Sequence, residues 1–344
     1  MKAITFTFPL LLCFFMACTP SEDNIAEEMP AGQQAVPWLS DWLEAWELVS
    51  DTMLHLSRDT APDMLFFDEQ YVYTTSRISL PQGTPFPGPG LFRQNLSWFK
   101  ARHKDSLLLP DRQKVPVQLM TFAAPAPEGR KVFFVMAAPS FWKNAGIESQ
   151  AFSLDKMLTG VFLHEFAHTR QFKGFGMLID SIEKAHSFPG ESMSDDIIQH
   201  LYAKDSQYVA VFRKEVDLFY KAAFAEQQED SRRLTRQAIA LYRKRQATYF
   251  ANDKTLATLD NIFLSMEGLG QMVAVLWLTH PKGGNVAYKD AVEGFRRKRN
   301  QWSQEEGLAM FLALRKLTRP DWQADMFSSR PRYIIDLLQQ AVGT

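Results

Sequence analysis

The sequence predicts an α+β protein in which a small mixed sheet region is followed by a mainly helical half. Three observations support this fold class. Strand-like stretches, at 64–75, 115–122 and 131–138, are confined to the first part of the chain. After Asp155 the apolar residues follow helical spacing almost throughout. The apolar fraction of 46% is ordinary for a globular protein, so a chain of 344 residues can build a large core. We place the mixed part at about 37–150 and the helical part at about 151–344.

The first 17 residues predict a signal peptide. Met1-Lys2 gives a positive start, and residues 4–17 are almost wholly apolar but too few for the roughly 20 residues of a membrane span. The ending Phe15-Met16-Ala17-Cys18 resembles a bacterial lipobox, which implies cleavage before Cys18 and lipid on its sulfur. The alternative is an ordinary secretory signal with an incidental cysteine. The resemblance implies a cell-envelope protein, lipid-anchored to the outer membrane on its periplasmic face or at the cell surface.

Residues 18–36 predict a flexible tether, because they are polar and include two prolines and a glycine. The chain has two cysteines, Cys13 and Cys18, so the domain at 37–344 has no thiol to offer a metal or a disulfide. A metal there must be held by His, Asp or Glu. We expect no other segment to span a bilayer, so membrane contact would depend on the N-terminal lipid.

The remaining elements follow from apolar spacing and turn residues. A helix is expected at 38–58, with tryptophans as core anchors, and the Pro- and Gly-rich stretch 81–90 predicts a loop. A second loop is expected at 174–190, beside the helix that carries the motif described below. Further helices are expected at roughly 155–173, 193–204, 206–227, 230–250, 254–279, 286–299, 303–316 and 333–341.

The charge of the chain gives no case for nucleic acid as a partner, because the net charge is −1. Two basic clusters, Arg243-Lys244-Arg245 and Arg296-Arg297-Lys298-Arg299, are local. We interpret each as a solvated helix face. Nothing in the sequence indicates an oligomeric state.

The sequence HEFAH, formed by His164, Glu165 and His168 with two uncharged residues between, is an instance of HExxH. On a helix, residues four apart lie on one face, so both imidazoles can reach one metal ion. Glu165 is then close enough to activate a water on that metal. The flanking residues 158–163 are mostly apolar and contain no proline, which indicates a buried helix. The alternative is a core helix with two satisfied histidines.

The motif and the order of elements resemble the zincin metallopeptidases, which would make 37–344 a zincin-like domain. In that family a twisted sheet precedes the HExxH helix, and a strand beside the cleft can pair with an extended substrate. The segment Arg130–Ala138 stands in the place of that strand. The resemblance implies a catalytic zinc ion, Zn2+, and a peptide or protein substrate.

A third ligand is needed, because catalytic zinc sites commonly use three protein ligands. The extended HExxHxxGxxH pattern is absent after His168. The gluzincin group takes a glutamate from a later helix instead, and Glu267 is the first choice because it lies within an apolar helical run, where a carboxylate is costly unless paired. Its neighbour Gly268 resembles the small residue that lets such helices approach. Glu191 is the alternative, although Ser192 and Asp195 after it resemble a capping box, and a third ligand from another group stays open.

These residues predict a zinc-dependent hydrolase, first of all a peptidase, in which His164, His168 and Glu267 bind zinc and Glu165 is the general base. Two other functions stay open: a catalytically idle zincin scaffold that acts in binding, and a zinc hydrolase of non-peptide bonds. Asp195 and Asp196 are candidates to support the metal ligands. The candidate donors to an oxyanion are His186, His200, Tyr202 and Tyr288.

Overall fold

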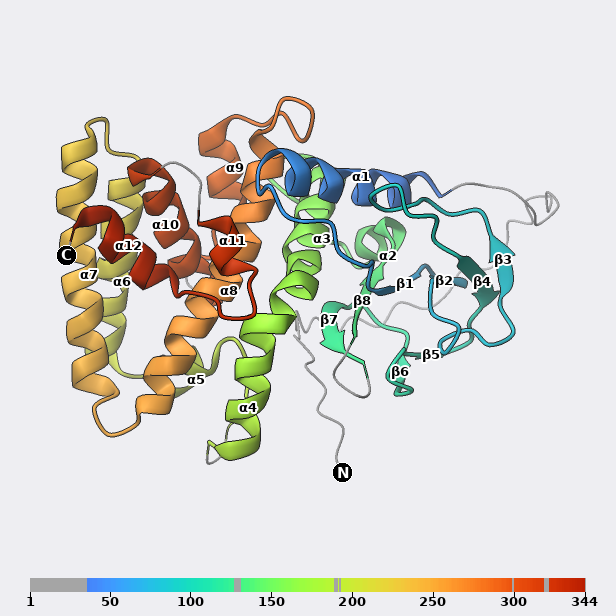
Figure 1. The fold of residues 1–344 in the computed structure, drawn as a ribbon, viewed down its shortest axis with the longest axis horizontal. Coiled ribbons are helices and arrows are strands. Elements are labelled where there is room, and N and C mark those ends of the chain that lie inside the picture. Colours follow the sequence, from blue (N-terminus) through green and yellow to red (C-terminus); the bar gives the residue numbers. More distant parts are fainter. Residues whose placement is uncertain are drawn as a thin grey trace.

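The computed structural model describes residues 36–126, 131–188, 191, 193–298, 300–318 and 322–343. The expected signal peptide, Cys18 and all but the last residue of the expected tether lie outside the described residues, as do Arg130, Ser192 and Arg299. The described chain has the predicted α+β organisation: an N-terminal mixed sheet is followed by a mainly helical C-terminal half (Figure 1).

The sheet has the strand order β3-β4-β2-β1-β8-β7 among the described residues. The pair β1–β8 is parallel and the other pairs are antiparallel, which makes the sheet mixed. The expected strand 64–75 is a hairpin instead, because the Asp68 carboxylate accepts the N–H groups of Gln70 and Tyr71 and turns the chain. A separate two-stranded hairpin is formed by β5 and β6. The strands are β1 Asp63–Phe67, β2 Tyr71–Thr74, β3 Thr84–Phe86, β4 Trp98–Arg102, β5 Ser106–Leu108, β6 Lys114–Pro116, β7 Thr121–Pro125 and β8 Val132–Ala137.

Three further expectations about the sheet need correction. The strand expected at 115–122 is divided between β6 and β7, which belong to different sheets. The stretch 81–90 is not all loop, because Thr84–Phe86 pairs with β4 as a short strand. The strand expected beside the cleft, at Arg130–Ala138, is β8, which is paired on both sides by β1 and β7. The strand at that edge of the sheet is therefore β7, and both β7 and β8 pack on the helix carrying the HExxH motif.

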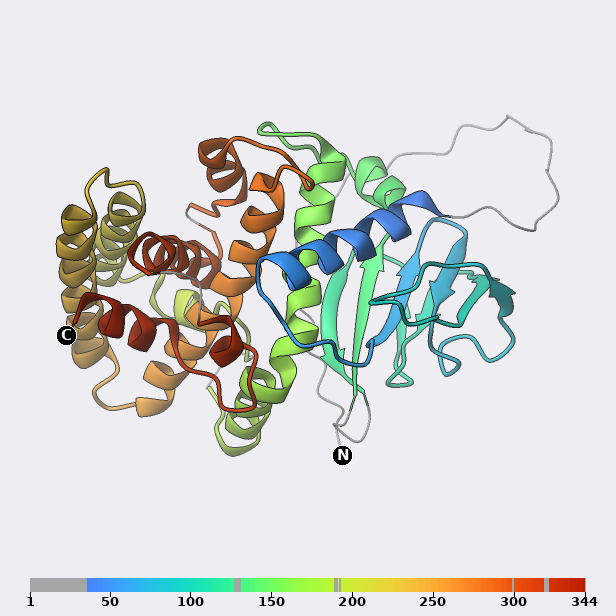
Figure 2. The ribbon, with the colours of Figure 1, turned by 45° about the horizontal axis from the view of Figure 1, so that its top comes forward.

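One face of the sheet is covered by α1 (Pro37–Thr52) and α3 (Leu154–Gln171), which lie side by side (Figure 2). Aromatic side chains fill the interface: Trp42 stacks on Phe162 at 5.5 Å between ring centroids, and Phe162 meets Phe134 of β8 edge-on at 5.4 Å. The opposite face receives α2 (Pro139–Asn144), whose Phe141 packs on Phe67. This aromatic layer fixes the position of α3 on the sheet.

The helix α3 begins at the cap residue Ser153, whose side chain accepts the Lys156 N–H. It does not end in a loop. A π-helical turn, Phe172–Gly176, follows it directly and leads into α4 (Met177–Ala185), so the prediction of a loop at 174–190 is wrong for 174–185. Gly174 is needed there, because a Cβ would collide with the Ser328 carbonyl and Pro331 of the C-terminal segment.

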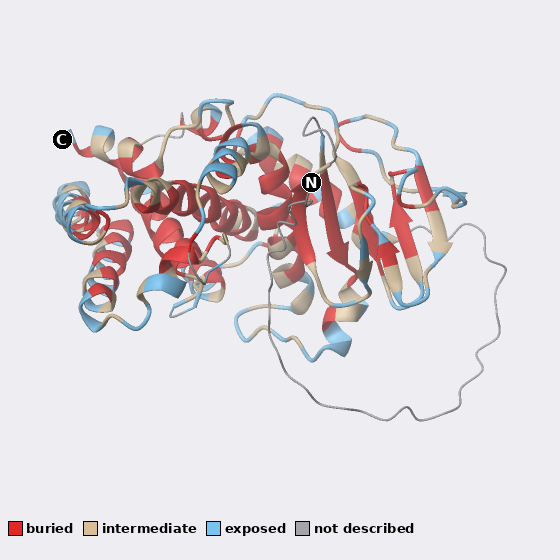
Figure 3. Ribbon diagram, turned by 90° about the horizontal axis from the view of Figure 1, so that it is seen from below, coloured by how far each residue is buried: buried red, intermediate tan, exposed pale blue. Residues whose placement is uncertain are grey.

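The helical half is organised around α8, which packs between α3 and α10. Figure 3 shows that the strands and these central helices are mostly buried. The contact of α8 with α10 depends on Gly268 and Gly307, since a Cβ on either would collide with the backbone of the other helix. The helices of this half are α5 Ile197–Tyr202, α6 Ser206–Ala223, α7 Gln228–Tyr249, α8 Lys254–Thr279, α9 Tyr288–Phe295, α10 Trp302–Leu317, α11 Gln323–Met326 and α12 Ile334–Val342.

The helix α8 is long and apolar enough to cross a membrane, contrary to the expectation that no segment after the signal peptide is. Its most apolar stretch is 89% buried inside the protein, however. It also carries the fully buried Glu267. These features are those of a core helix.

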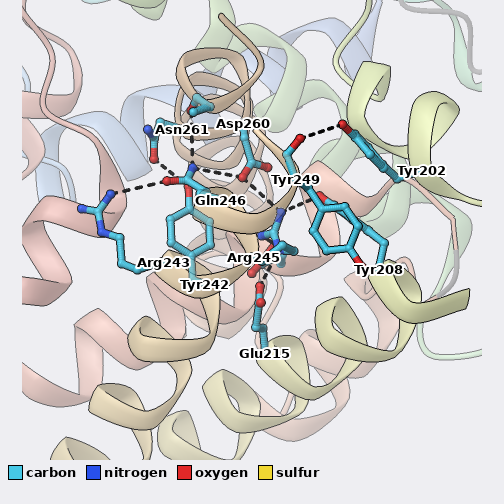
Figure 4. A network of polar contacts seen from close by, with 12 residues as sticks. Tyr202, Tyr208, Glu215, Tyr242, Arg243, Arg245, Gln246, Tyr249, Asp260 and Asn261 are labelled. Carbon is cyan, nitrogen blue, oxygen red and sulfur yellow. Dashed lines mark hydrogen bonds and ion pairs between the residues drawn. The ribbon is translucent and has the colours of Figure 1, made fainter. Parts of the chain in front are cut away.

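A buried charge cluster joins α6, α7, α8 and α10 around Arg245 (Figure 4). The guanidinium binds Glu215 at 2.8 Å, Glu306 at 3.0 Å and Asp260 at 3.2 Å, and it also donates to the Tyr208 hydroxyl. The Arg245 side chain is completely buried. The interpretation of the cluster at 243–245 as a solvated helix face is therefore wrong for this residue.

Candidate metal centre

The structure brings His164 and His168 of α3 together with Glu267 of α8. The two Nε2 atoms are 3.1 Å apart, His164 Nε2 lies 3.1 Å from Glu267 Oε2, and His168 Nε2 lies 3.4 Å from Glu267 Oε1. All three side chains are buried. The ligand atoms lie within 4.8 Å of one another, so this group could hold a metal ion.

The protonation states of these residues favour metal binding. Burial lowers the pKa of His164 to about 4, so its imidazole is neutral near pH 7 and can offer a lone pair. Burial raises the pKa of Glu267, but His168 and His164 outweigh that effect and hold the pKa below its usual value. In addition, Glu267 Oε1 is buried without a hydrogen bond. A neutral imidazole and a carboxylate are the forms that bind a metal.

Glu165 lies next to the three ligand residues but is not one of them. Its side chain is buried, and its Oε2 atom has no hydrogen-bond partner. Burial raises the pKa of Glu165, the charge of Glu267 raises it further, and Arg297 opposes both. A carboxylate with a raised pKa and a free oxygen is suited to exchange a proton with a nearby molecule.

Gln171 orients His168. The His168 Nδ1–H donates to Gln171 Oε1 at 2.7 Å, which leaves Nε2 as the lone-pair nitrogen facing Glu267. The Gln171 amide also donates to the Met266 carbonyl of α8 at 3.2 Å, so it ties α3 to the helix that carries the third residue. The sequence analysis missed this residue. Its place three residues after His168, on the same helix face, was the available signal.

His164 is held by close packing. A Cβ on Gly270 would lie 2.7 Å from His164 Nδ1, so only glycine leaves room for the imidazole at this point of α8. Gly270 is therefore the small residue that admits the histidine, whereas Gly268 was expected to let helices approach each other. Gly268 allows the approach of α10.

Two residues from the α9–α10 region complete the surroundings of the site, and the sequence analysis predicted neither. Gln304 is buried, donates to Glu267 Oε2 at 3.2 Å, and accepts a hydrogen bond from Arg297 Nε at 2.9 Å. Arg297 is thus only partly exposed and interacts with the site, whereas its basic cluster was interpreted as a solvated face. Lys298, the next residue, is exposed as expected.

The other candidates lie elsewhere. Glu191 is exposed and faces His200 at 3.7 Å between Oε2 and Nδ1. Asp195 is buried, and burial together with the charge of Glu267 raises its pKa well above the usual value. His164 Nδ1 has no hydrogen-bond partner among the described residues, so neither Asp195 nor Asp196 supports this histidine there. The proposed oxyanion donors have other contacts: His186 with Asp253, His200 with Glu191, the Tyr202 hydroxyl with the Tyr249 carbonyl, and the Tyr288 ring with Phe224.

The edge strand β7 lies beside the centre. Its register and its flanking hydrogen bonds to β8 leave the backbone groups of Thr121, Ala123 and Pro125 directed away from β8. Within the described chain no strand pairs with that edge. A small apolar pocket of about 30 Å3 adjoins it, lined by residues of β7 and by His168, Phe172, Ile179 and Met266.

The arrangement can therefore hold a metal, place a carboxylate beside it and present a strand edge and an apolar pocket next to both. Comparison of the chain with family models, with curated proteins and with solved structures gives no match.

Proposed function

We propose that this chain is a zinc-dependent hydrolase of peptide bonds, built on a zincin-like scaffold. One observation carries the proposal: the two Nε2 atoms lie 3.1 Å apart, and each lies close to one carboxylate oxygen of Glu267, His164 to Oε2 at 3.1 Å and His168 to Oε1 at 3.4 Å. Tetrahedral zinc with bonds of about 2.0–2.1 Å requires its ligand atoms to be about 3.3–3.4 Å apart. The donor set of two histidines and one glutamate is one that catalytic zinc uses, with a fourth position open.

Bound zinc would supply a water with its pKa lowered to about 7 and would polarise the scissile carbonyl. Glu165 then takes the proton of the attacking water and returns it to the leaving amine. Its unpartnered oxygen and its position next to His164 suit this role. Burial keeps His164 neutral by lowering its pKa, and the hydrogen bond from His168 Nδ1–H to Gln171 keeps His168 in the required tautomer.

The surroundings of the centre favour a peptide as substrate. An extended peptide can add to an exposed strand edge through its backbone, and β7 offers the N–H and C=O groups of Thr121 and Ala123 for this. The apolar pocket between β7, Phe172 and Met266 would receive a side chain. A zinc hydrolase of non-peptide bonds would have no use for the strand edge.

We also propose that lipid on Cys18 attaches this hydrolase to the outer membrane of a bacterial envelope. This part rests on the sequence of residues 1–18 alone. The domain would then act on peptides or proteins of the envelope or its surroundings.

The proposal is tested by elemental analysis of zinc in the full chain, in Glu267→Ala and in Glu191→Ala. We expect about one zinc per chain, lost in Glu267→Ala and kept in Glu191→Ala, because only Glu267 lies beside the two histidines. Cleavage of a peptide library by the unmodified chain, lost when a chelator removes the zinc, would support the peptidase. Zinc without peptide hydrolysis would favour the non-peptide hydrolase, and no zinc at all would favour the idle scaffold.

Replacement of Gln171 by leucine should weaken zinc binding by roughly 10- to 100-fold. The change removes the acceptor of His168 Nδ1–H, so the imidazole is no longer held with Nε2 toward the centre. Affinity is measured by competition with a chromogenic chelator. Thr169→Val is the matched control, since the Thr169 hydroxyl bonds only the Phe166 carbonyl of its own helix. Equal zinc affinity in Gln171→Leu and the unmodified chain would refute the orienting role.

A further inference from the structure

The segment between α9 and α10 is held in a fixed conformation by Glu305. The buried carboxylate of this residue accepts hydrogen bonds from Arg296 Nε and Nη2, at 3.0 and 2.8 Å, and from the backbone N–H groups of Arg297 and Lys298, at 2.7 and 2.8 Å. Lys298 and Gln301 adopt left-handed backbone angles, with φ of 54° and 53°. A non-glycine residue takes such a conformation at a cost, which surrounding contacts must offset.

This anchoring directs the Arg297 side chain toward the metal centre. Its Nε donates to Gln304 Oε1 at 2.9 Å, and Gln304 in turn donates to Glu267. The guanidinium is close enough to the carboxylates of Glu165 and Glu267 to interact with both. A chain of two hydrogen bonds thus joins Arg297 to the third metal-site residue.

The end of the Arg297 guanidinium has no partner within the described part of the chain. Nε is occupied by Gln304, but the two terminal nitrogens form no hydrogen bond or ion pair with a described residue. The carboxylate of Glu305, which accepts the backbone N–H of Arg297, is already saturated by Arg296 and the backbone. The Arg297 side chain is partly exposed, so these two nitrogens are free to meet a ligand. They form the fork that binds a carboxylate through two parallel hydrogen bonds.

We propose that Arg297 binds a carboxylate of the substrate beside the metal centre. The inference rests on the proposed function for its substrate class, a peptide. The carboxylate is either the C-terminal group of the peptide or an Asp or Glu side chain next to the cleaved bond. Arg297 is in this view a specificity-determining residue, and Gln304 and Glu305 are positioning residues that hold it.

The test measures binding, so that it does not depend on hydrolysis. The full chain carrying Glu165→Gln is immobilised, with zinc in the buffer. It is then exposed to a mixture of randomised hexapeptides, in which each sequence is present in equal amounts with a C-terminal carboxylate and with a C-terminal carboxamide. Mass spectrometry of the retained peptides gives two ratios: carboxylate over carboxamide ends, and Asp or Glu over Asn or Gln. We expect one of them to be about tenfold or more, as a charge-assisted pair gives.

Arg297→Gln should bring that ratio to about one, Arg297→Lys should keep part of it, and Lys298→Gln should leave it unchanged. Lys298 is the matched control because it is adjacent, equally charged and exposed. Zinc content and thermal unfolding of each variant show whether the site is intact. The inference is overturned if both ratios are near one in the protein that keeps Arg297. It is also overturned if the higher ratio is unchanged in Arg297→Gln. If the unmodified chain hydrolyses peptides but neither ratio exceeds one, the proposed function stands and the role of Arg297 fails. If carboxylate-dependent binding is seen but no peptide is hydrolysed, the role of Arg297 in binding stands and the proposed function fails.

Discussion

Glu165→Gln is expected to abolish hydrolysis while the full chain keeps its zinc. Glutamine has nearly the same shape as glutamate but cannot accept a proton from water at this position. Loss of a general base costs about 10²- to 10⁴-fold in rate. Zinc should remain because Glu165 is not among the three residues whose ligand atoms meet, His164, His168 and Glu267. The measurements are kcat on a cleaved peptide and zinc per chain by elemental analysis.

The control for this change is Glu191→Gln, the same substitution at an exposed glutamate that faces His200. It should alter neither rate nor zinc. A Glu165→Gln protein that still cleaves peptides at the original rate would rule out the proposed mechanism. Loss of zinc together with activity would instead mean that Glu165 supports the metal.

Arg245→Met is expected to destabilise the protein by about 3–5 kcal/mol. Methionine fills a similar volume but leaves the carboxyl groups of Glu215, Asp260 and Glu306 buried without their shared cation. Because these groups come from α6, α8 and α10, the loss affects the packing of the whole helical half. The free energy of unfolding is measured by urea titration of the full chain.

Arg243→Met is the control. Arg243 is partly exposed, and its ion pair with Asp336 is 3.6 Å long, so its loss should cost at most about 1 kcal/mol.

The penalty of Arg245→Met should grow with pH. Burial already raises the pKa of Glu306 and Glu215 in the unmodified protein. An acid whose pKa is raised by folding stabilises the fold at low pH, and this stabilisation is lost as the pH rises through the folded pKa. Removing the arginine raises both pKa values further. The difference in unfolding free energy between variant and unmodified chain should therefore be larger at pH 8 than at pH 5, and an equal difference at both would contradict this account.

Local patterns were enough to predict the main elements. The helix expected at 254–279 is α8, residue for residue, because its apolar run begins after Asp253, whose side chain caps the helix, and ends before His280. The burial of Glu267 was predictable for the same reason, since a carboxylate within such a run needs a partner. The expectation at 174–190 failed because Gly174 and Gly176 suggested a loop. Gly174 instead makes room within a continuous helix for a segment near Ser328, more than 150 residues later in the sequence (328 − 174 = 154).

The residues around the metal centre were harder to predict, because their roles depend on contacts between distant segments. Gln304 lies in the first turn of α10 among several polar residues, which is typical of an exposed helix start, yet it donates a hydrogen bond to Glu267 in the core. Arg245 and Arg297 stand in basic clusters like those of many surface helices. The packing of α7 against α6 and α10 turns Arg245 inward, and the packing of α8 against α3 and α10 brings Gln304 to Glu267. HExxH needs no such information, since both histidines and Glu165 lie within one helix.

The packing of α8 between α3 and α10 has a consequence for the timing of activity. Glu267 follows His168 by 267 − 168 = 99 residues, and Gln304 comes later still. As the chain leaves the ribosome, the two histidines are synthesised long before the carboxylate that shares their metal. A growing or partly folded chain can therefore hold only an incomplete set of ligands. If the chain is the zinc hydrolase proposed above, it would stay inert toward its own unfolded segments until the last helices have docked.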